Sequence, residues 1–129
     1  MPTRRTVFFI SDRTGITAEM LGNSLLTQFE DFQFRRITVP FIDSPEKVED
    51  VIRQVNETGA AEGRRPIVFS SVVDEIASET IRARAEALTL DLFQIFIAPL
   101  EAELAAKSSH AAGRTHGIAN SHEYYTRME

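Results

Sequence analysis

Residues 7–19 read Val-Phe-Phe-Ile-Ser-Asp-Arg-Thr-Gly-Ile-Thr-Ala-Glu, and this stretch decides the fold. Its first four residues are apolar and predict a buried strand. A polar turn follows and leads into a helix, expected to run to about residue 31, with one apolar stripe made by Ala18, Leu21, Leu25 and Phe29. Strand, turn and helix in this order make the first half of a β-α-β unit, with the turn at the carboxyl end of the strand.

The turn after this strand predicts an anion site, and a phosphate group is its natural ligand. Backbone N–H groups at a helix start lack partners within the helix, and the helix dipole places positive charge there. A purely structural alternative stays open, in which Asp12, Thr14 and Thr17 cap the helix and Gly15 relieves a tight turn. The sequence contains neither a glycine-rich dinucleotide fingerprint nor a P-loop, so the turn alone does not decide between them.

The rest of the chain continues the alternation of strands and helices. Ser44 and Pro45 predict a helix start, and Gly59 a stop. An acidic face of that helix is expected to be solvated. An alanine-rich helix is expected over residues 74–88, with core contacts at Ile76, Ile81 and Leu88. A short helix with a proline start is expected over residues 99–106. Further strands are expected at residues 34–39 (at a sheet edge, because of two arginines), 66–70 and 92–97.

This order predicts an α/β fold: an open, mostly parallel, four-stranded, Rossmann-like sheet with helices on both faces. The chain of 129 residues suits one domain. Its net charge of −5 argues against a nucleic-acid partner or an anionic membrane surface. The absence of cysteine excludes disulfides and thiolate metal sites. Without a membrane span or a secretory signal in the sequence, we expect a cytoplasmic location.

Polar residues follow the first and third expected strands. In open α/β sheets, ligands bind beyond the carboxyl ends of the strands, where the winding reverses. If these two strands are neighbours, their turns face one crevice. The candidate residues there are Ser11, Asp12 and Thr14 from the first turn, and Ser70 and Ser71 from the other.

Arg114 and His116 are further candidates near the end of the chain. Arginine binds phosphate through two parallel hydrogen bonds, and histidine carries or moves a proton near neutral pH. The alternative is an exposed turn that ends at Gly117. The three histidines, His110, His116 and His122, are spaced by six residues, which matches no metal-ligand pattern, so no metal is assigned. No nucleophile and base stand out, so the catalytic residue is unknown.

Three segments together resemble a known family: residues 9–19, residues 37–41 and the motif Arg114-Thr115-His116-Gly117. They are similar to the amino-terminal part of the phosphoenolpyruvate synthase regulatory proteins. The resemblance implies a bifunctional enzyme. As a serine/threonine kinase it uses ADP to phosphorylate a threonine of a dikinase, either phosphoenolpyruvate synthase (pyruvate, water dikinase) or pyruvate phosphate dikinase. As a pyrophosphorylase it uses inorganic phosphate to remove that group and releases pyrophosphate.

Members of this family continue into a carboxyl-terminal domain with a nucleotide-binding P-loop, which this sequence does not reach. The resemblance therefore implies an amino-terminal domain over residues 1–106 and a connecting segment over residues 107–129. We expect the chain alone to be inactive and to hold no bound ADP or phosphate. An alternative is a non-catalytic domain for target docking or self-association as a homo-oligomer. The candidate phosphate-binding residues are Ser11, Asp12, Thr14, Gly15, Thr17, Ser70, Ser71, Arg114 and His116.

Overall fold

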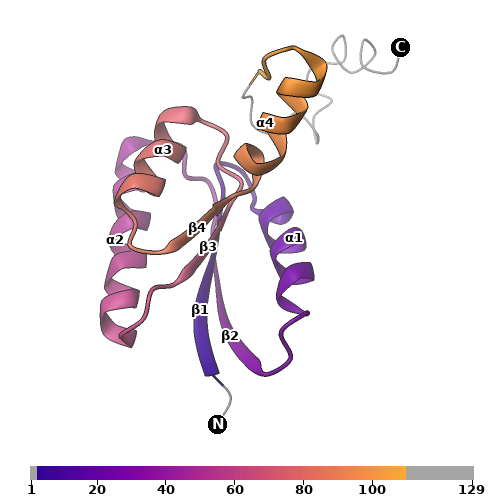
Figure 1. Ribbon diagram of the computed structural model, residues 1–129. Helices are drawn as coiled ribbons and strands as arrows, with labels where there is room; N and C mark the ends of the chain where they lie inside the picture. The colour runs from indigo at the N-terminus through magenta and orange to yellow at the C-terminus, as the bar shows by residue number, and fades with distance from the viewer. Residues whose placement is uncertain (1–2, 110–129) are drawn as a thin grey trace.

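The first strand, β1 (Thr3–Ile10), lies inside a sheet of four parallel strands in the order β2-β1-β3-β4. Its neighbours are β2 (Phe32–Val39) and β3 (Ile67–Ser70), and β4 (Leu88–Asp91) forms the far edge. The structure, a computed structural model, describes residues 3–109 (Figure 1). The predicted parallel α/β sheet, the edge position of the second strand and the adjacency of the first and third strands are all confirmed.

Helices cover both faces of this sheet (Figure 1). Helix α1 (Ile16–Leu26) packs on one face with Val7 and Phe9 of β1. Helices α2 (Pro45–Glu62) and α3 (Glu75–Arg84) pack on the other face with Phe8 and Ile10. Because both faces are covered, every residue from 7 to 10 is buried, which explains the unbroken apolar run in the sequence.

Helix α1 is shorter than predicted and buries only part of the predicted stripe: Ala18 is buried and Leu21 packs against the core. It ends at Leu26, and Leu25 and Phe29 are exposed. The residues that face the sheet are Ala18, Gly22 and Leu26. A Cβ atom on Gly22 would lie 2.5 Å from the Phe9 ring, so the missing side chain lets the helix approach the sheet closely.

Helix α2 begins as predicted and ends later. The Ser44 side chain accepts a hydrogen bond from the Lys47 backbone N–H, with Pro45 as the first helical residue. Gly59 does not end the helix, which continues to Glu62. Gly59 instead lies against Pro66, where a Cβ atom would come within 3.0 Å of the proline ring. The predicted acidic face is exposed at Glu46, Glu49, Asp50 and Glu57.

The fourth strand and the last helix differ most from the prediction. Residues 92–97 are not a strand: they open helix α4 (Leu92–Leu104), and β4 comes directly before them. The Asp91 side chain caps this helix by accepting a hydrogen bond from the Gln94 N–H at 3.0 Å, and Pro99 lies inside it. A six-residue segment with five apolar residues is compatible with either structure, and the cap favours the helix.

Helix α3 ends earlier than predicted because strand β4 begins earlier than the predicted fourth strand. The alanine-rich helix stops at Arg84 because Leu88 already belongs to β4. Of its three predicted core residues, only Ile81 is buried. Ile76 is 79% exposed, and Leu88 lies at the exposed edge of the sheet.

Candidate functional site

The carboxyl ends of three strands lie level with one another. Ile10 pairs with Ser70, and Ser70 pairs with Asp91. The chain leaves β1 toward β2 on one side and leaves β3 toward β4 on the other, so the winding reverses between β1 and β3. This is the position at which open α/β sheets bind ligands. The structure therefore brings the first turn and the turn after β3 together, as predicted.

The serines of both turns are buried and shape the backbone. Ser11 Oγ accepts a hydrogen bond from the Arg13 N–H at 3.0 Å, and Ser70 Oγ accepts one from the Val72 N–H at 3.2 Å. Each serine thus binds the backbone two residues ahead, a recurrent turn arrangement. Ser71 continues the sheet, because its N–H donates to the Ile10 carbonyl at 2.9 Å. Ser11 and Ser71 line the crevice between the turns.

Asp12 joins the two turns. Its Oδ2 accepts a hydrogen bond from the Val73 N–H at 2.9 Å, across 61 residues of sequence. The other oxygen, Oδ1, is buried and has no hydrogen-bond partner among the residues described. The carboxylate therefore fixes the spacing of the turns and adds negative charge beside the crevice. Binding of an anion there needs positive charge from elsewhere.

The start of helix α1 can supply part of that charge. Gly15 is the N-cap residue, and no side chain caps the first turn. The alternative in which Asp12, Thr14 and Thr17 cap the helix is therefore wrong, because the Asp12 carboxylate binds Val73 instead. Gly15 has a φ of 88°, which favours glycine, and a Cβ atom there would lie 3.2 Å from the Thr38 methyl group.

Arg13 is a cation that the sequence-based candidates left out. Its side chain is exposed, lines the same crevice and forms no ion pair within residues 3–109. Its position between Asp12 and Thr14, inside the predicted turn, was the sequence signal that could have identified it.

The crevice has a volume of about 30 Å³, space on the order of one water molecule, so this chain does not by itself enclose a phosphate. Its lining residues are Ser11, Asp12, Arg13, Thr14, Gly15, Ile16, Thr17, Ser71, Val73 and Phe93.

The segment after β2 supports the first turn from the other side. The Phe41 N–H donates to the Arg13 carbonyl at 2.8 Å, and the Ile42 N–H donates to the Ser11 carbonyl at 2.9 Å. Phe41 has a φ of 58°, an outlier for a bulky residue, while its ring is half exposed. Such strain concentrates at functional sites. Residues 39–42 thus hold the first turn through backbone hydrogen bonds.

The remaining candidates fall outside this geometry. Thr14 and Thr17 are exposed at the crevice, whereas Ser70 does not line it. Arg114 and His116 lie outside the described residues, as do His110, His122 and the rest of the motif at residues 114–117. Their part in the site stays a prediction.

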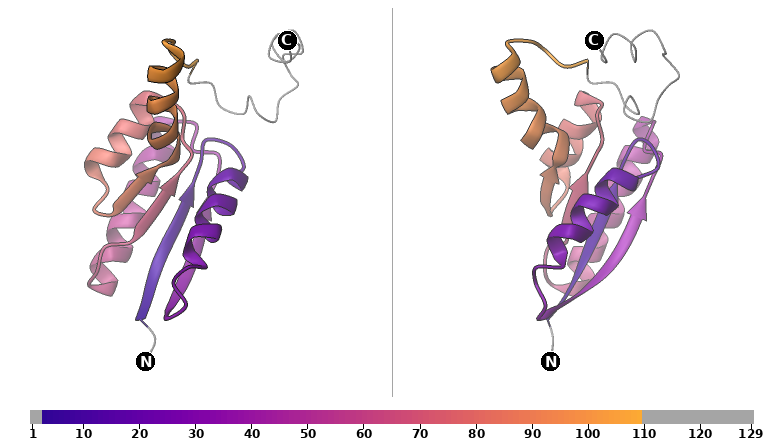
Figure 2. Two further views of the ribbon diagram at one scale, coloured as in Figure 1. Left: turned by 45° about the vertical axis from the view of Figure 1, so that its right-hand side comes forward. Right: turned by 90° about the vertical axis from the view of Figure 1, so that its right-hand side faces the viewer.

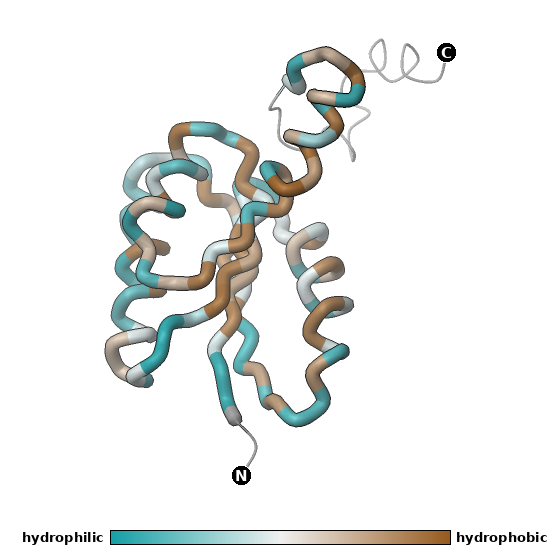
Figure 3. Tube along the Cα trace, viewed as in Figure 1, coloured by the Kyte–Doolittle hydropathy of each residue, from teal (hydrophilic) through white to brown (hydrophobic). Residues whose placement is uncertain are grey.

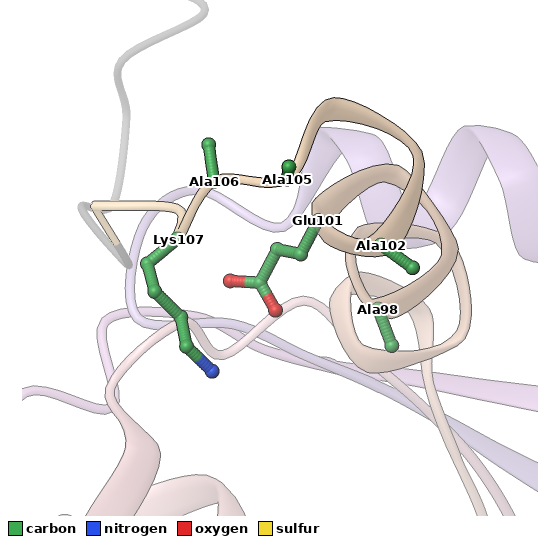
Figure 4. Close-up of a pocket in the computed structure, with 6 residues that line it drawn as sticks. All are labelled: Ala98, Glu101, Ala102, Ala105, Ala106 and Lys107. Carbon is green, nitrogen blue, oxygen red and sulfur yellow. The ribbon is translucent and has the colours of Figure 1, made fainter.

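Larger hollows lie elsewhere and offer less chemistry. One of about 470 Å³ lies at the end of α4, between alanine side chains, with Glu101 and Lys107 beside it (Figure 4). Glu101 is engaged by the Ser108 N–H at 2.7 Å. Another hollow, of about 430 Å³, is lined by Arg4, Arg35, Glu62 and Arg64. Neither hollow includes residues of the two turns.

A sequence profile of the family described as Kinase/pyrophosphorylase matches residues 7–129. The chain belongs to this family. The match includes both turns that form the crevice.

Curated relatives agree with this assignment. A protein of Legionella pneumophila (strain Corby) is 51% identical over 126 residues, which are 98% of this chain and 46% of the relative. A protein of Burkholderia mallei (strain SAVP1) is 53% identical over 124 residues, 96% of this chain and 45% of the relative. Both carry the name "Putative phosphoenolpyruvate synthase regulatory protein". The chain thus spans less than half the length of these two relatives and matches their amino-terminal part.

Helix length and composition bear on membrane association. Over residues 3–109, no helix combines the length and the apolar character that crossing a membrane requires.

Proposed function

We propose that this chain is the amino-terminal part of a cytoplasmic, bifunctional serine/threonine kinase and pyrophosphorylase that regulates phosphoenolpyruvate synthase. Below, "the intact protein" means this chain continued by the part that its longer relatives have. Family membership supports the reaction class, and the names of the relatives support the target. The domain division near residue 106 belongs to the same proposal.

The two reactions balance as phosphoryl transfers to and from one threonine. In the kinase direction, the threonine hydroxyl oxygen bonds to the terminal phosphorus of ADP, the bridging P–O bond breaks, AMP leaves and the hydroxyl proton is released. In the reverse function, an oxygen of inorganic phosphate attacks the phosphothreonine, which restores the hydroxyl and yields pyrophosphate. Both reactions depend on placing anionic groups and stabilising their charge.

The proposed role of this chain rests on the start of α1, which no side chain caps and which lies where the winding of the sheet reverses. Its N–H groups and the Arg13 guanidinium lie beside one crevice, where they can stabilise a phosphate held mainly by the rest of the intact protein. Asp12 and the buried serines keep the two turns in place and do not need to touch the ligand.

The chain alone is expected to catalyse neither reaction. The intact protein and the 129-residue chain are incubated with ADP and phosphoenolpyruvate synthase, and phosphothreonine is quantified by mass spectrometry. A second assay supplies inorganic phosphate and the phosphorylated synthase, and measures pyrophosphate. Turnover is expected only from the intact protein. Comparable turnover by the 129-residue chain would refute the proposed division of labour, and no transfer from ADP by the intact protein would refute the donor.

A second candidate function is docking of the target, or self-association, without a catalytic contribution. Exposed apolar side chains on helix α4 favour it. The two functions separate in the kinetic comparison of Arg13 variants described in the Discussion, because a docking domain does not need a cation in the crevice.

A further inference from the structure

Helix α4 carries an apolar stripe, and three of its members are more than half exposed. Its members recur at the spacing of one helix face, three or four residues apart. Phe96 is 56% exposed, Leu100 is 51% exposed and Leu104 is 69% exposed. We call this the α4 stripe: Phe93, Phe96, Ile97, Leu100 and Leu104.

The helix projects beyond the sheet instead of covering it. It rises from the carboxyl end of β4 and extends beyond the end of the sheet (Figures 1 and 2). Only its first residue, Leu92, joins the buried core. The chain trace along α4 is predominantly hydrophobic (Figure 3). Neighbouring apolar side chains left this exposed mark an interaction surface.

The α4 stripe begins at the candidate site. Phe93 lines the crevice together with Arg13 and Thr14 of the first turn, and the later members continue from there along α4. A body that packs on Phe96 and Leu100 therefore lies next to the open side of the crevice. The stripe and the crevice share Phe93.

We propose that the α4 stripe is the docking surface for the carboxyl-terminal part of the intact protein. This chain accounts for 46% of the Legionella relative and matches its amino-terminal part, so more than half of that protein remains to be packed somewhere. Helix α4 is the last element described before that part begins. Docking there covers the exposed apolar side chains and closes the crevice. The inference deepens the proposed function and rests on it for the closing of a shared site.

Thiol labelling tests this docking without any activity measurement. Residues 1–129 contain no cysteine, so Leu100→Cys and Ile76→Cys place single probes in this part of the chain. Ile76 on α3 is the matched control, because it is an exposed apolar helix residue outside the stripe. With native cysteines beyond residue 129 replaced, an aromatic disulfide reagent is expected to label Leu100→Cys at least about tenfold more slowly than Ile76→Cys in the intact protein. In the 129-residue chain, both sites are expected to react fast.

Three outcomes of the labelling experiment overturn the proposal. Equal labelling rates in the intact protein mean that nothing docks on the stripe. Slow labelling of Leu100→Cys in the 129-residue chain that disappears on dilution assigns the stripe to a second copy. Slow labelling there that does not depend on concentration assigns it to residues of this chain. Phe96→Cys serves as a second probe if Leu100→Cys does not fold. An inactive but protected intact protein would refute the proposed function and leave the docking surface standing.

Discussion

Arg13→Ala in the intact protein is expected to lower kcat/KM for phosphoryl transfer at least about tenfold, with the melting temperature nearly unchanged. Losing one charge-assisted hydrogen bond to a phosphate costs about 1.5–3 kcal/mol of transition-state stabilisation, and about 1.4 kcal/mol corresponds to a factor of ten in rate. Stability should not change, because the Arg13 side chain is exposed and has no ion-pair partner within the described part of the chain. Initial rates with ADP and the synthase, together with calorimetry, measure both quantities.

Arg64→Ala is the matched control for this variant. Arg64 is also exposed and also lacks an ion pair among residues 3–109, but it lies in the turn before β3, at the opposite ends of the strands. Its removal should leave kcat/KM unchanged. Arg114→Ala enters the same assay as the sequence-based candidate, with the same expected loss. If Arg13→Ala and Arg64→Ala behave alike, the crevice does not contribute charge to the reaction.

Asp12→Ala is expected to lower the free energy of unfolding of the 129-residue chain by about 1–3 kcal/mol, because a buried backbone donor then loses its acceptor. That donor is the Val73 N–H, bound at 2.9 Å, in a residue that is itself buried. The substitution removes a side-chain hydrogen bond that joins the two turns across 61 residues of sequence. Urea denaturation of the two proteins measures the difference.

Asp12→Asn and Asp31→Ala are the controls for this second effect. Asparagine keeps a carbonyl oxygen for Val73, so it should retain more stability than alanine. Asp31 is exposed and has no described partner, so its removal should change the unfolding free energy by less than about 0.5 kcal/mol. A change of that small size in Asp12→Ala would show that the carboxylate does not hold the turns together.

The sequence predicted the fold where local pattern and long-range packing agree. The apolar residues 7–10 and the Ser44-Pro45 helix start are confirmed because strand burial and capping are local properties. The prediction of a strand at residues 92–97 was wrong. It relied on aromatic and β-branched side chains, which are typical of strands. The spacing of Phe93, Phe96 and Leu100, with Asp91 as a cap before them, was the signal for a helix.

The sequence predicted where the candidate site lies but not the contacts within it. Ser11 and Ser71 both line the crevice because β1 and β3 are neighbours, and this adjacency was itself part of the predicted fold. The partnership of Asp12 with Val73 depends on the register of two strands and on the shape of both turns, which no local pattern specifies. Likewise, the close approach of Gly15 to Thr38 appears only after β2 has paired with β1. Because of such long-range contacts, Asp12 links the two turns through Val73 and does not cap helix α1.

Amide NMR of the intact protein, isotopically labelled and titrated with inorganic phosphate, tests most directly whether the start of α1 is a phosphate site. The account predicts saturable shifts at the N–H groups of Ile16, Thr17 and Ala18, which weaken in Arg13→Ala and persist in Arg64→Ala. Saturable shifts confined to other parts of the intact protein, with these three amides unmoved, would contradict it.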